Sequence, residues 1–455
     1  TLGSGLAGRV NVVVSGQATI TGSGLLGETR GSGAGGDVSL QASELLLTDG
    51  ATISSSSLGS GNAGRVNVVV SGQATITGSA PGRPSGLLAE TRGSGAGGDV
   101  SLQASELLLT DGATISSSTL GSGLAGRVNV VVSGQATITG SGLLGETRGS
   151  GAGGDVSLQA SELLLTDGAT ISSSSLGSGN AGRVNVVVSG QATITGSASG
   201  RPSGLLAETR GSGAGGDVSL QASVLQLTDG ATISSSSLGS GLAGNIGIRL
   251  SDSLDMQGGI ISTHALTSDG GNIRIVAPRL IHLVGSQITT SVQSGAGGGG
   301  NIFIDPQFVI LQNSQIIANA FGGPGGNINI VAGQLIADPT TVITASSALG
   351  IAGSVNIDAP DTDVSAGLAV LPVSFLDAAS LLRAGCGGAR AGLSSLVEVG
   401  RGGLPPDPDG YLPSLDLGTL AHGTALASRA DRWRATALQP ALQMIASLPI
   451  FGCGP

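Results

Sequence analysis

The chain has 455 residues, of which 82 are glycine; hydrophobic residues make up 39%, aromatic residues 2%, and the formal net charge is −10. The acidic balance argues against nucleic-acid binding, which requires a basic surface, and the apolar content argues against intrinsic disorder. No uninterrupted apolar run reaches the roughly 18 residues that a membrane-spanning helix requires, so no such helix is expected.

The first half of the chain is a nearly perfect internal repeat, because residues 1–118 and 119–236 differ at three positions. The differing pairs are Pro81 and Ser199, Glu106 and Val224, and Leu108 and Gln226. Each copy divides into shorter units that begin at an Ala-Gly or Gly-Gly pair, and thirteen such starts follow one another at spacings of 26–33 residues. The starts are Ala7, Ala34, Ala63, Ala96, Ala125, Ala152, Ala181, Ala214, Ala243, Gly270, Gly299, Gly325 and Ala352. A unit this short cannot bury a hydrophobic face alone, so neighbouring units must stack.

The first apolar run of each unit alternates with period two, which predicts a strand with one buried face. In the first unit its inward residues are Val10, Val12 and Val14. The equivalents later in the chain are Val38 and Leu40, Ile246 and Ile248, Ile273 and Ile275, Ile302 and Ile304, and Ile328 and Ile330.

The second and third runs of each unit are also short and apolar. In the second run, QATIT or ELLLT, positions 107 and 109 stay apolar between the two copies while positions 106 and 108 change. Leu107 and Leu109 are therefore predicted to point inward. The third run, ATISSSS, is expected to expose its serine hydroxyls and to bury one isoleucine in each copy of the motif. These isoleucines are Ile53, Ile115, Ile171 and Ile233.

Three strands per turn of about 28 residues, with glycine corners and no helical pattern, predict an all-β fold: a right-handed parallel β-helix of about thirteen coils. A β-sandwich would need hairpins and would not repeat in phase, and a β-propeller needs four strands and about 40 residues per blade. The repeat array is assigned to residues 1–360. Residues 361–455 are expected to form a small, partly helical cap and tail, with helices at 374–385 and 424–448.

The residue before the first strand is polar in every unit. In the first eight units it is alternately positively and negatively charged. It forms a charge ladder of Arg9, Asp37, Arg65, Asp99, Arg127, Asp155, Arg183 and Asp217, followed by an Asn ladder of Asn245, Asn272, Asn301 and Asn327. Alternating charges stacked one coil apart attract on both sides, and stacked amides can form hydrogen bonds. Both ladders are interpreted as structural, with each exposed ion pair worth about 0.2–1 kcal/mol.

The other polar patterns of the sequence are interpreted as structural and not as functional sites. Glu28 and Arg30 recur in every second unit and are expected to form a local ion pair. Four identical copies argue against a catalytic carboxylate, which needs a unique setting. The Asp49-Gly50 turn lacks the nonapeptide period of calcium-binding β-rolls. The T-x-T motif at Thr19 is expected to be interrupted in alternate units, which weakens an ice-binding interpretation. His264, His282 and His422 show no metal-ligand spacing, so no metal, cofactor or catalytic residue is predicted.

The two cysteines, Cys386 and Cys453, both lie near the C-terminus. One disulfide in an oxidising compartment and two unrelated thiols are both compatible with the sequence.

The repeats of the form GNIRI, GNIFI and GNINI, with the segment RGGLPPDPDG at 401–410, resemble filamentous-haemagglutinin-like exoproteins of two-partner secretion. The resemblance covers about 7–357 and Val364 to Ser414. It implies a right-handed β-helix exported through an outer-membrane β-barrel transporter to the surface or surroundings of a Gram-negative-type bacterium. Some such adhesins have a C-terminal disulfide loop, which Cys386 and Cys453 would resemble with a wider spacing.

These observations favour a non-catalytic, secreted or surface-exposed structural and adhesive fibre protein that mediates attachment, aggregation or biofilm and filament formation. The chain is expected to associate with further copies of itself and to bind a glycan or a surface ligand. Two alternatives stay open: a carbohydrate-active β-helix enzyme, which would need clustered, non-repeating charged residues, and an ice-binding or other flat-surface binder.

Overall fold

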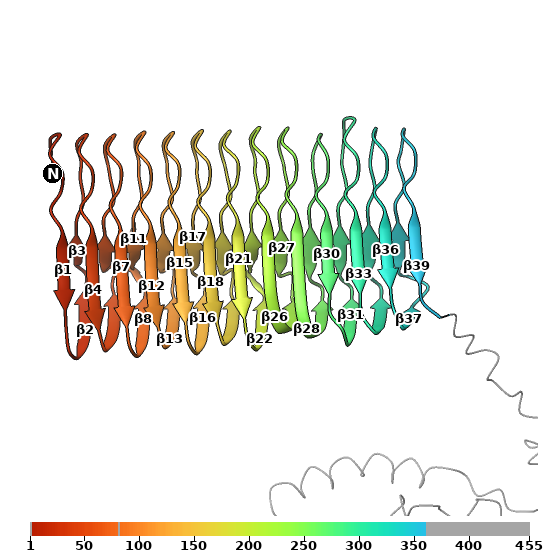
Figure 1. The fold of residues 1–455 in the computed structure, drawn as a ribbon, viewed down its shortest axis with the longest axis horizontal. Helices are drawn as coiled ribbons and strands as arrows, with labels where there is room; N and C mark the ends of the chain where they lie inside the picture. Colours follow the sequence, from red (N-terminus) through yellow and green to blue (C-terminus); the bar gives the residue numbers. More distant parts are fainter. Residues whose placement is uncertain (1, 81, 361–455) are drawn as a thin grey trace, which may run out of the picture. The chain divides into compact units, whose positions relative to one another are not determined.

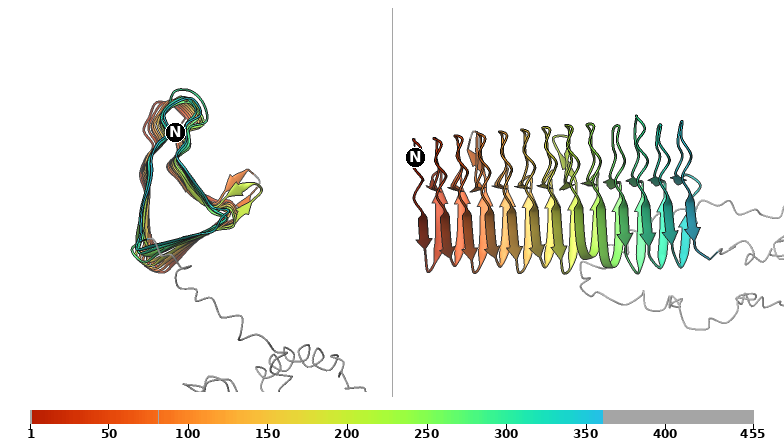
Figure 2. Two further views of the ribbon diagram at one scale, coloured as in Figure 1. Left: turned by 90° about the vertical axis from the view of Figure 1, so that its right-hand side faces the viewer. Right: turned by 45° about the horizontal axis from the view of Figure 1, so that its top comes forward.

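The computed structural model describes residues 2–80 and 82–360, and throughout these residues the chain is a parallel β-solenoid (Figure 1). Thirteen first strands and twelve third strands are present, so twelve coils are complete and a thirteenth has only its first strand. In Figures 1 and 2 each coil descends on one side, crosses the base and rises on the other while the chain advances along the axis, which is right-handed winding. The predicted fold of the repeat array is confirmed.

The first and second strands of the coils together form one 23-stranded sheet that bends between them. The first strands are β1 (Val10–Val13), β4 (Val38–Ala42), β7 (Val66–Val70), β12 (Val100–Ala104), β15 (Val128–Val132), β18 (Val156–Ala160), β21 (Val184–Val188), β30 (Ile273–Val276), β33 (Ile302–Asp305), β36 (Ile328–Val331) and β39 (Val355–Asp358). The second strands are β2 (Gln17–Thr21), β5 (Glu44–Thr48), β8 (Gln73–Thr77), β13 (Glu106–Thr110), β16 (Gln135–Thr139), β19 (Glu162–Thr166), β22 (Gln191–Thr195), β31 (Leu280–Val284), β34 (Phe308–Gln312) and β37 (Gln334–Ala337). In coils eight and nine the two strands are continuous, as β26 (Val218–Thr228) and β28 (Ile246–Gln257).

The third strands form a separate 12-stranded sheet. They are β3 (Gly24–Leu26), β6 (Thr52–Ser54), β11 (Gly86–Leu88), β14 (Thr114–Ser116), β17 (Gly142–Leu144), β20 (Thr170–Ser172), β25 (Gly204–Leu206), β27 (Thr232–Ser234), β29 (Ile260–Ser262), β32 (Gln287–Thr289), β35 (Gln315–Ile317) and β38 (Val342–Thr344). The end-on view in Figure 2 shows a triangular body with the three strands on its sides and a narrow lobe above it.

The interior of the triangular body is filled by the residues that the period-two pattern assigns to it. Leu107 and Leu109 are 1% and 0% exposed, and Val10 pairs in register with Val38 of the next coil. The predicted inward isoleucines of the third strands, such as Ile53, are likewise buried. Since identical inward residues stack in every second coil, the core is a continuous column rather than a separate cluster in each coil.

The narrow lobe consists of the glycine-rich segment that joins the third strand to the next coil. Its neck is closed where the N–H of Gly36 donates to the carbonyl of Gly27 at 2.8 Å. A Cβ on Gly154 would lie 1.7 Å from the carbonyl oxygen of Gly126 in the preceding coil. Glycine is required there because the backbones of successive coils approach too closely for any side chain.

The corner between the second and third strands is a tight turn in most of the early coils. Asp49 and Gly50 both have positive φ, 55° and 78°, the conformation for which Asp-Gly is favoured. Coils three and seven instead carry a six-residue insertion that forms a short antiparallel hairpin. The hairpins are β9 (Ser79–Ala80) with β10 (Arg83–Pro84), and β23 (Ser197–Ala198) with β24 (Arg201–Pro202), and they project from this corner in Figure 2.

Candidate binding groove

The charge ladder is stacked in register along the edge of the first strands, and two ion pairs in it join an arginine to the aspartate of the following coil. The guanidinium Nε of Arg9 lies 3.7 Å from Oδ2 of Asp37, and that of Arg65 lies 3.9 Å from Oδ2 of Asp99. Within residues 2–80 and 82–360, Asp37 forms no ion pair with Arg65 of the following coil. The ion pairs in the described part of the ladder thus join an arginine to the aspartate of the next coil, and attraction on the other side of each charge stays a prediction.

The contact that continues from coil to coil is a hydrogen bond to the backbone. Oδ1 of Asp37 accepts the N–H of Arg65 at 3.0 Å, and the same bond recurs from Asp99 to the N–H of Arg127 and from Asp155 to that of Arg183. An aspartate can accept this bond and an arginine cannot, so the bond forms only between an aspartate and the coil that follows it.

The Asn ladder makes this contact at every step. Oδ1 of Asn245 accepts both the N–H and the Nδ2 of Asn272, at 3.0 and 3.1 Å. Asn272 makes the same two contacts with Asn301, and Asn301 accepts the N–H of Asn327 at 2.9 Å. Since asparagine carries both a donor and an acceptor, it can occupy consecutive coils where a single charge type could not.

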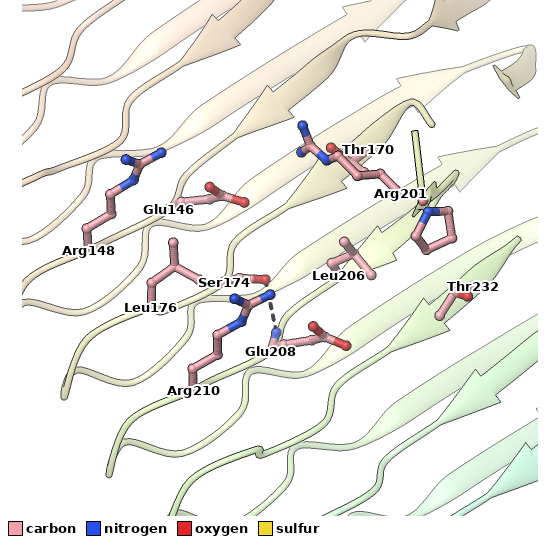
Figure 3. A pocket seen from close by; sticks show the side chains of 12 residues that line it. Glu146, Arg148, Thr170, Ser174, Leu176, Arg201, Leu206, Glu208, Arg210 and Thr232 are labelled. Carbon is pink, nitrogen blue, oxygen red and sulfur yellow. Dashed lines mark hydrogen bonds between the residues drawn. The ribbon is translucent and has the colours of Figure 1, made fainter. Parts of the chain in front are cut away.

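A groove of about 440 Å³ runs over the third-strand face of coils five to eight (Figure 3). Its charged lining residues are Glu146, Arg148, Arg201, Glu208 and Arg210. The lobe-side ends of the third strands supply four of these residues, and hairpin β23–β24 supplies Arg201, so the groove lies between the sheet and the hairpin.

Each glutamate of the groove is held by serines from the two neighbouring coils. The hydroxyl of Ser172 donates to Oε1 of Glu146, and the hydroxyl of Ser234 donates to Oε1 of Glu208. From the other side, Oγ of Ser174 accepts the backbone N–H of Glu208 at 3.1 Å. The carboxylates are thereby fixed in orientation with their second oxygen available.

This arrangement differs from the predicted Glu–Arg pair. In the described coils, none of Glu90, Glu146 and Glu208 lies within ion-pair distance of an arginine. Burial raises the pKa of Glu90, while its hydrogen bond from Ser116 and the charges of Arg92 and Arg148 act in the opposite direction. The serine contact replaces the ion pair because it comes from the coil stacked directly above, a neighbour that spacing within one unit does not reveal.

The serines of the third run are also placed differently from the prediction. Ser54, Ser55 and Ser57 are each 0% exposed, and the hydroxyl of Ser55 donates to the carbonyl of Gly36 at 2.5 Å. The run bends from the third strand into the neck of the lobe, so both of its sides face protein. The hydroxyl of Ser54 contacts Glu28 of the preceding coil, that of Ser55 bridges the neck of its own coil, and that of Ser57 is buried without a hydrogen-bond partner in the described part of the chain, so the run is not a solvent-exposed row.

Arginine and leucine alternate beside the glutamates along the same face. This Arg–Leu row consists of Arg30, Leu58, Arg92, Leu120, Arg148, Leu176, Arg210 and Leu238. Parallel bridges at the preceding positions, such as Thr29 to Ser57, fix the row in register. Leu120, Leu176 and Leu238 are 43%, 38% and 44% exposed, so the apolar members face solvent as the arginines do.

The threonines at the end of the second strand form a continuous column through the first eight coils. Thr48 donates to Thr21 at 3.1 Å and Thr110 to Thr77 at 2.8 Å. The column two residues earlier is interrupted as predicted, since Thr19 is followed by Leu46 in the next coil. Of these two positions in the described second strands, only the later one carries threonine in all of the first eight coils, so the threonines do not form a two-column array.

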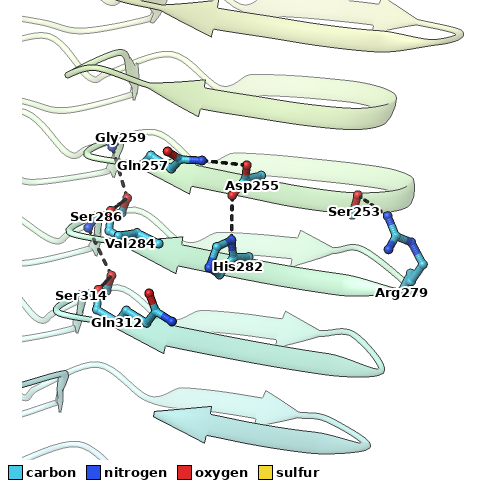
Figure 4. Close-up of polar contacts among 10 residues, drawn as sticks. All are labelled: Ser253, Asp255, Gln257, Gly259, Arg279, His282, Val284, Ser286, Gln312 and Ser314. Carbon is cyan, nitrogen blue, oxygen red and sulfur yellow. Dashed lines mark hydrogen bonds and ion pairs between the residues drawn. The ribbon is translucent and has the colours of Figure 1, made fainter. Parts of the chain in front are cut away.

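One polar cluster lies beyond the two near-identical 118-residue copies and joins coils nine and ten (Figure 4). The guanidinium of Arg279 forms two hydrogen bonds with the carboxylate of Asp252, and Nδ1 of His282 lies 2.9 Å from Oδ1 of Asp255. These contacts lower the pKa of Asp252 and raise that of Arg279, chiefly through their mutual hydrogen bonds. This cluster is not evident from the sequence, because its partners are about 27 residues apart and become neighbours only after the coils are aligned.

Neither the groove nor this cluster holds a metal-ligand set: the described residues include no group of three or more His, Cys, Asp or Glu that could bind an ion. His264 lies in the coil-nine equivalent of the glutamate positions, and partial burial lowers its pKa. His422, Cys386 and Cys453 lie outside the described residues, as do the predicted cap and its helices.

No family model, curated protein or solved structure matches the chain. No helix in the described part of the chain is long and apolar enough to cross a membrane.

Proposed function

We propose that this chain is a non-catalytic, secreted or surface-exposed solenoid that mediates attachment, aggregation or filament formation. The observation that carries the proposal is the repetition of the solvent-facing rows. Over the first eight coils Glu and Arg recur in every second coil and Leu in the coils between, and the Glu carboxylates are held by serines in each copy. A surface of identical sites along a rod suits multivalent contact, in which many weak contacts add up.

Export through an outer-membrane β-barrel transporter belongs to the same proposal. It rests on the resemblance of the GNIRI-type repeats and of the 401–410 segment to exoproteins of two-partner secretion. A single-site enzyme is less well supported, since a catalytic carboxylate requires a unique setting and these glutamates recur in four coils with the same serine contact.

A deletion that keeps the coil register tests the proposal. Removing residues 119–236 joins Ser118 to Ser237 in phase and shortens the rod by four coils, about 19 Å at a spacing of roughly 4.8 Å. Microspheres coated with the full chain should aggregate or attach to cell monolayers and glass more than those coated with heat-unfolded protein. The deletion variant should keep its β-sheet circular dichroism and attach less strongly.

Two results would contradict the proposal. One is attachment and aggregation no greater than with heat-unfolded protein. The other is release of reducing sugar from a polysaccharide that is lost in Glu146→Gln, which would support the enzyme alternative. Glu106→Gln, on the exposed face of β13, is the matched control for charge removal.

A further inference from the structure

The Arg–Leu row sets a length scale that a bound polymer would have to match. Successive arginines in the row are two coils apart, about 9.6 Å at the usual strand spacing of roughly 4.8 Å. An exposed leucine lies halfway between them. The row therefore offers a cationic contact and an apolar contact in strict alternation along the solenoid axis.

The groove adds a defined set of hydrogen-bonding groups to this alternation. Arg148, Arg201 and Arg210 have no ion-pair partner among the described residues, and a guanidinium presents a planar fork that suits a carboxylate. In Glu146 and Glu208, one carboxylate oxygen accepts a hydrogen bond from serine, and the second oxygen is available to accept a hydrogen bond from a hydroxyl of the ligand. With three arginines against two glutamates, the lining carries one net positive charge.

We infer that this groove binds a linear anionic polysaccharide with a carboxylate on alternate sugars. The carboxylates pair with the arginines at the two-coil period, and the neutral sugars lie over the leucines and Pro202 with hydroxyls donating to the glutamates. The first copy of the super-repeat carries the same residues, with hairpin β9–β10 in the equivalent place, so a long polymer meets two such sites four coils apart, about 19 Å. The inference rests on the proposed attachment function and names its ligand.

Other extended ligands fit the row less well. An extended peptide repeats its side chains on one face about every 6.6–6.8 Å, which does not match the arginine spacing, and an acidic peptide offers few donors to the glutamates. Phosphates along one strand of duplex DNA repeat about every 3.4 Å. A second solenoid shares the period, but it would meet the hairpins that project beside this face (Figure 2).

The test is the binding of hyaluronan octasaccharide, an alternating acidic and neutral polymer, to the full chain by calorimetry at low and moderate salt. Because the first copy of the super-repeat keeps its own site, the double variant Arg148→Gln/Arg210→Gln should retain one site of the parent's affinity and bind about tenfold or more weakly at the other, since each arginine supplies a charge-assisted hydrogen bond. Arg201→Gln, on the hairpin, should weaken binding without touching the core. The matched control is Arg127→Gln/Arg183→Gln, which removes the same charge from the charge ladder on another face and should bind as the parent does.

Three results would overturn the inference: no binding of the octasaccharide by the parent chain, equal weakening in the two double variants, or tighter binding of poly-L-glutamate than of the octasaccharide. The last result would assign the groove to an acidic peptide. Circular dichroism of every variant separates loss of contact from loss of fold. If the microspheres attach and the octasaccharide does not bind, the ligand assignment fails and the attachment function stands; if the microspheres do not attach, the attachment function fails on its own test.

Discussion

Asn272 and Asn301 lie one coil apart, and the side-chain oxygen of the first accepts the backbone N–H of the second at 2.9 Å. Its amide nitrogen donates to Asn245 in the preceding coil. One side chain thus connects three consecutive coils at a position where the backbone has just left the lobe. The aspartates of the charge ladder perform the accepting half of this role in the earlier coils.

Asn272→Ala should increase hydrogen exchange at the Asn301 amide and lower local stability by about 0.5–1.5 kcal/mol for each of the three hydrogen bonds that its side chain makes. Asn272→Asp keeps the acceptor and should preserve most of the protection. Exchange followed by mass spectrometry can resolve this region, because the sequence around Asn301 is not repeated. Equal exchange in the alanine variant and the parent would show that the contact does not hold the coils.

The close stacking of glycines in the lobe predicts a strong asymmetry among Gly→Ala substitutions. Gly154→Ala places a methyl group 1.7 Å from the Gly126 carbonyl and should cost about 1–3 kcal/mol or more, as overpacking does. Gly247→Ala is the control, since its Cβ would meet nothing within 4 Å. Thermal unfolding should show a lower midpoint for the first variant only; matched midpoints would mean that the lobe rearranges freely.

Alternation along the second strand predicts opposite outcomes for adjacent leucines. Leu109→Ala removes a fully buried side chain and should destabilise the solenoid by about 2–5 kcal/mol. Leu108→Ala, on the outer face, should change the unfolding free energy little, as the presence of Gln226 at the equivalent position indicates. Denaturant titration of both variants provides the comparison, and a similar loss at both positions would contradict the assigned face.

Glu90, on the third-strand face, should make the stability of the solenoid depend on pH. Because burial raises the pKa of Glu90, the folded chain holds its proton more tightly than the unfolded chain does. The contribution of Glu90 to stability should therefore be fully present below the ordinary carboxyl pKa of about 4.3 and be lost as pH rises through the raised value. Glu90→Gln should remove this decline, so the stability of the variant relative to the parent should increase with pH.

Unfolding monitored at intervals from pH 3 to pH 8 measures that difference. A constant difference between parent and variant across the whole range would show that Glu90 does not titrate differently on folding. Glu106→Gln again controls for the removal of a charge from an outer face.

Much of the fold follows from local pattern. Period-two alternation identified inward residues such as Leu107 and Ile53, and the positions that differ between the two copies separated inner from outer faces. The charge and Asn ladders were located by the same alignment of units. The alignment of units does not predict the hydrogen bonds at these positions, because each polar group has potential partners in its own coil, in the coil before and in the coil after.

The sequence by itself determined the repeat, the strand register and the identity of the stacked rows, since these depend only on residue spacing and on the need to bury apolar side chains. Only the tertiary structure decided that Glu146 is held by Ser172, that Asp37 accepts a backbone N–H, and that the third-run serines are buried. It also placed hairpin β23–β24 beside the Arg–Leu row to form a groove. The physical reason is the short distance between coils: residues some 26–35 positions apart become nearest neighbours, and hydrogen-bond geometry then selects among them.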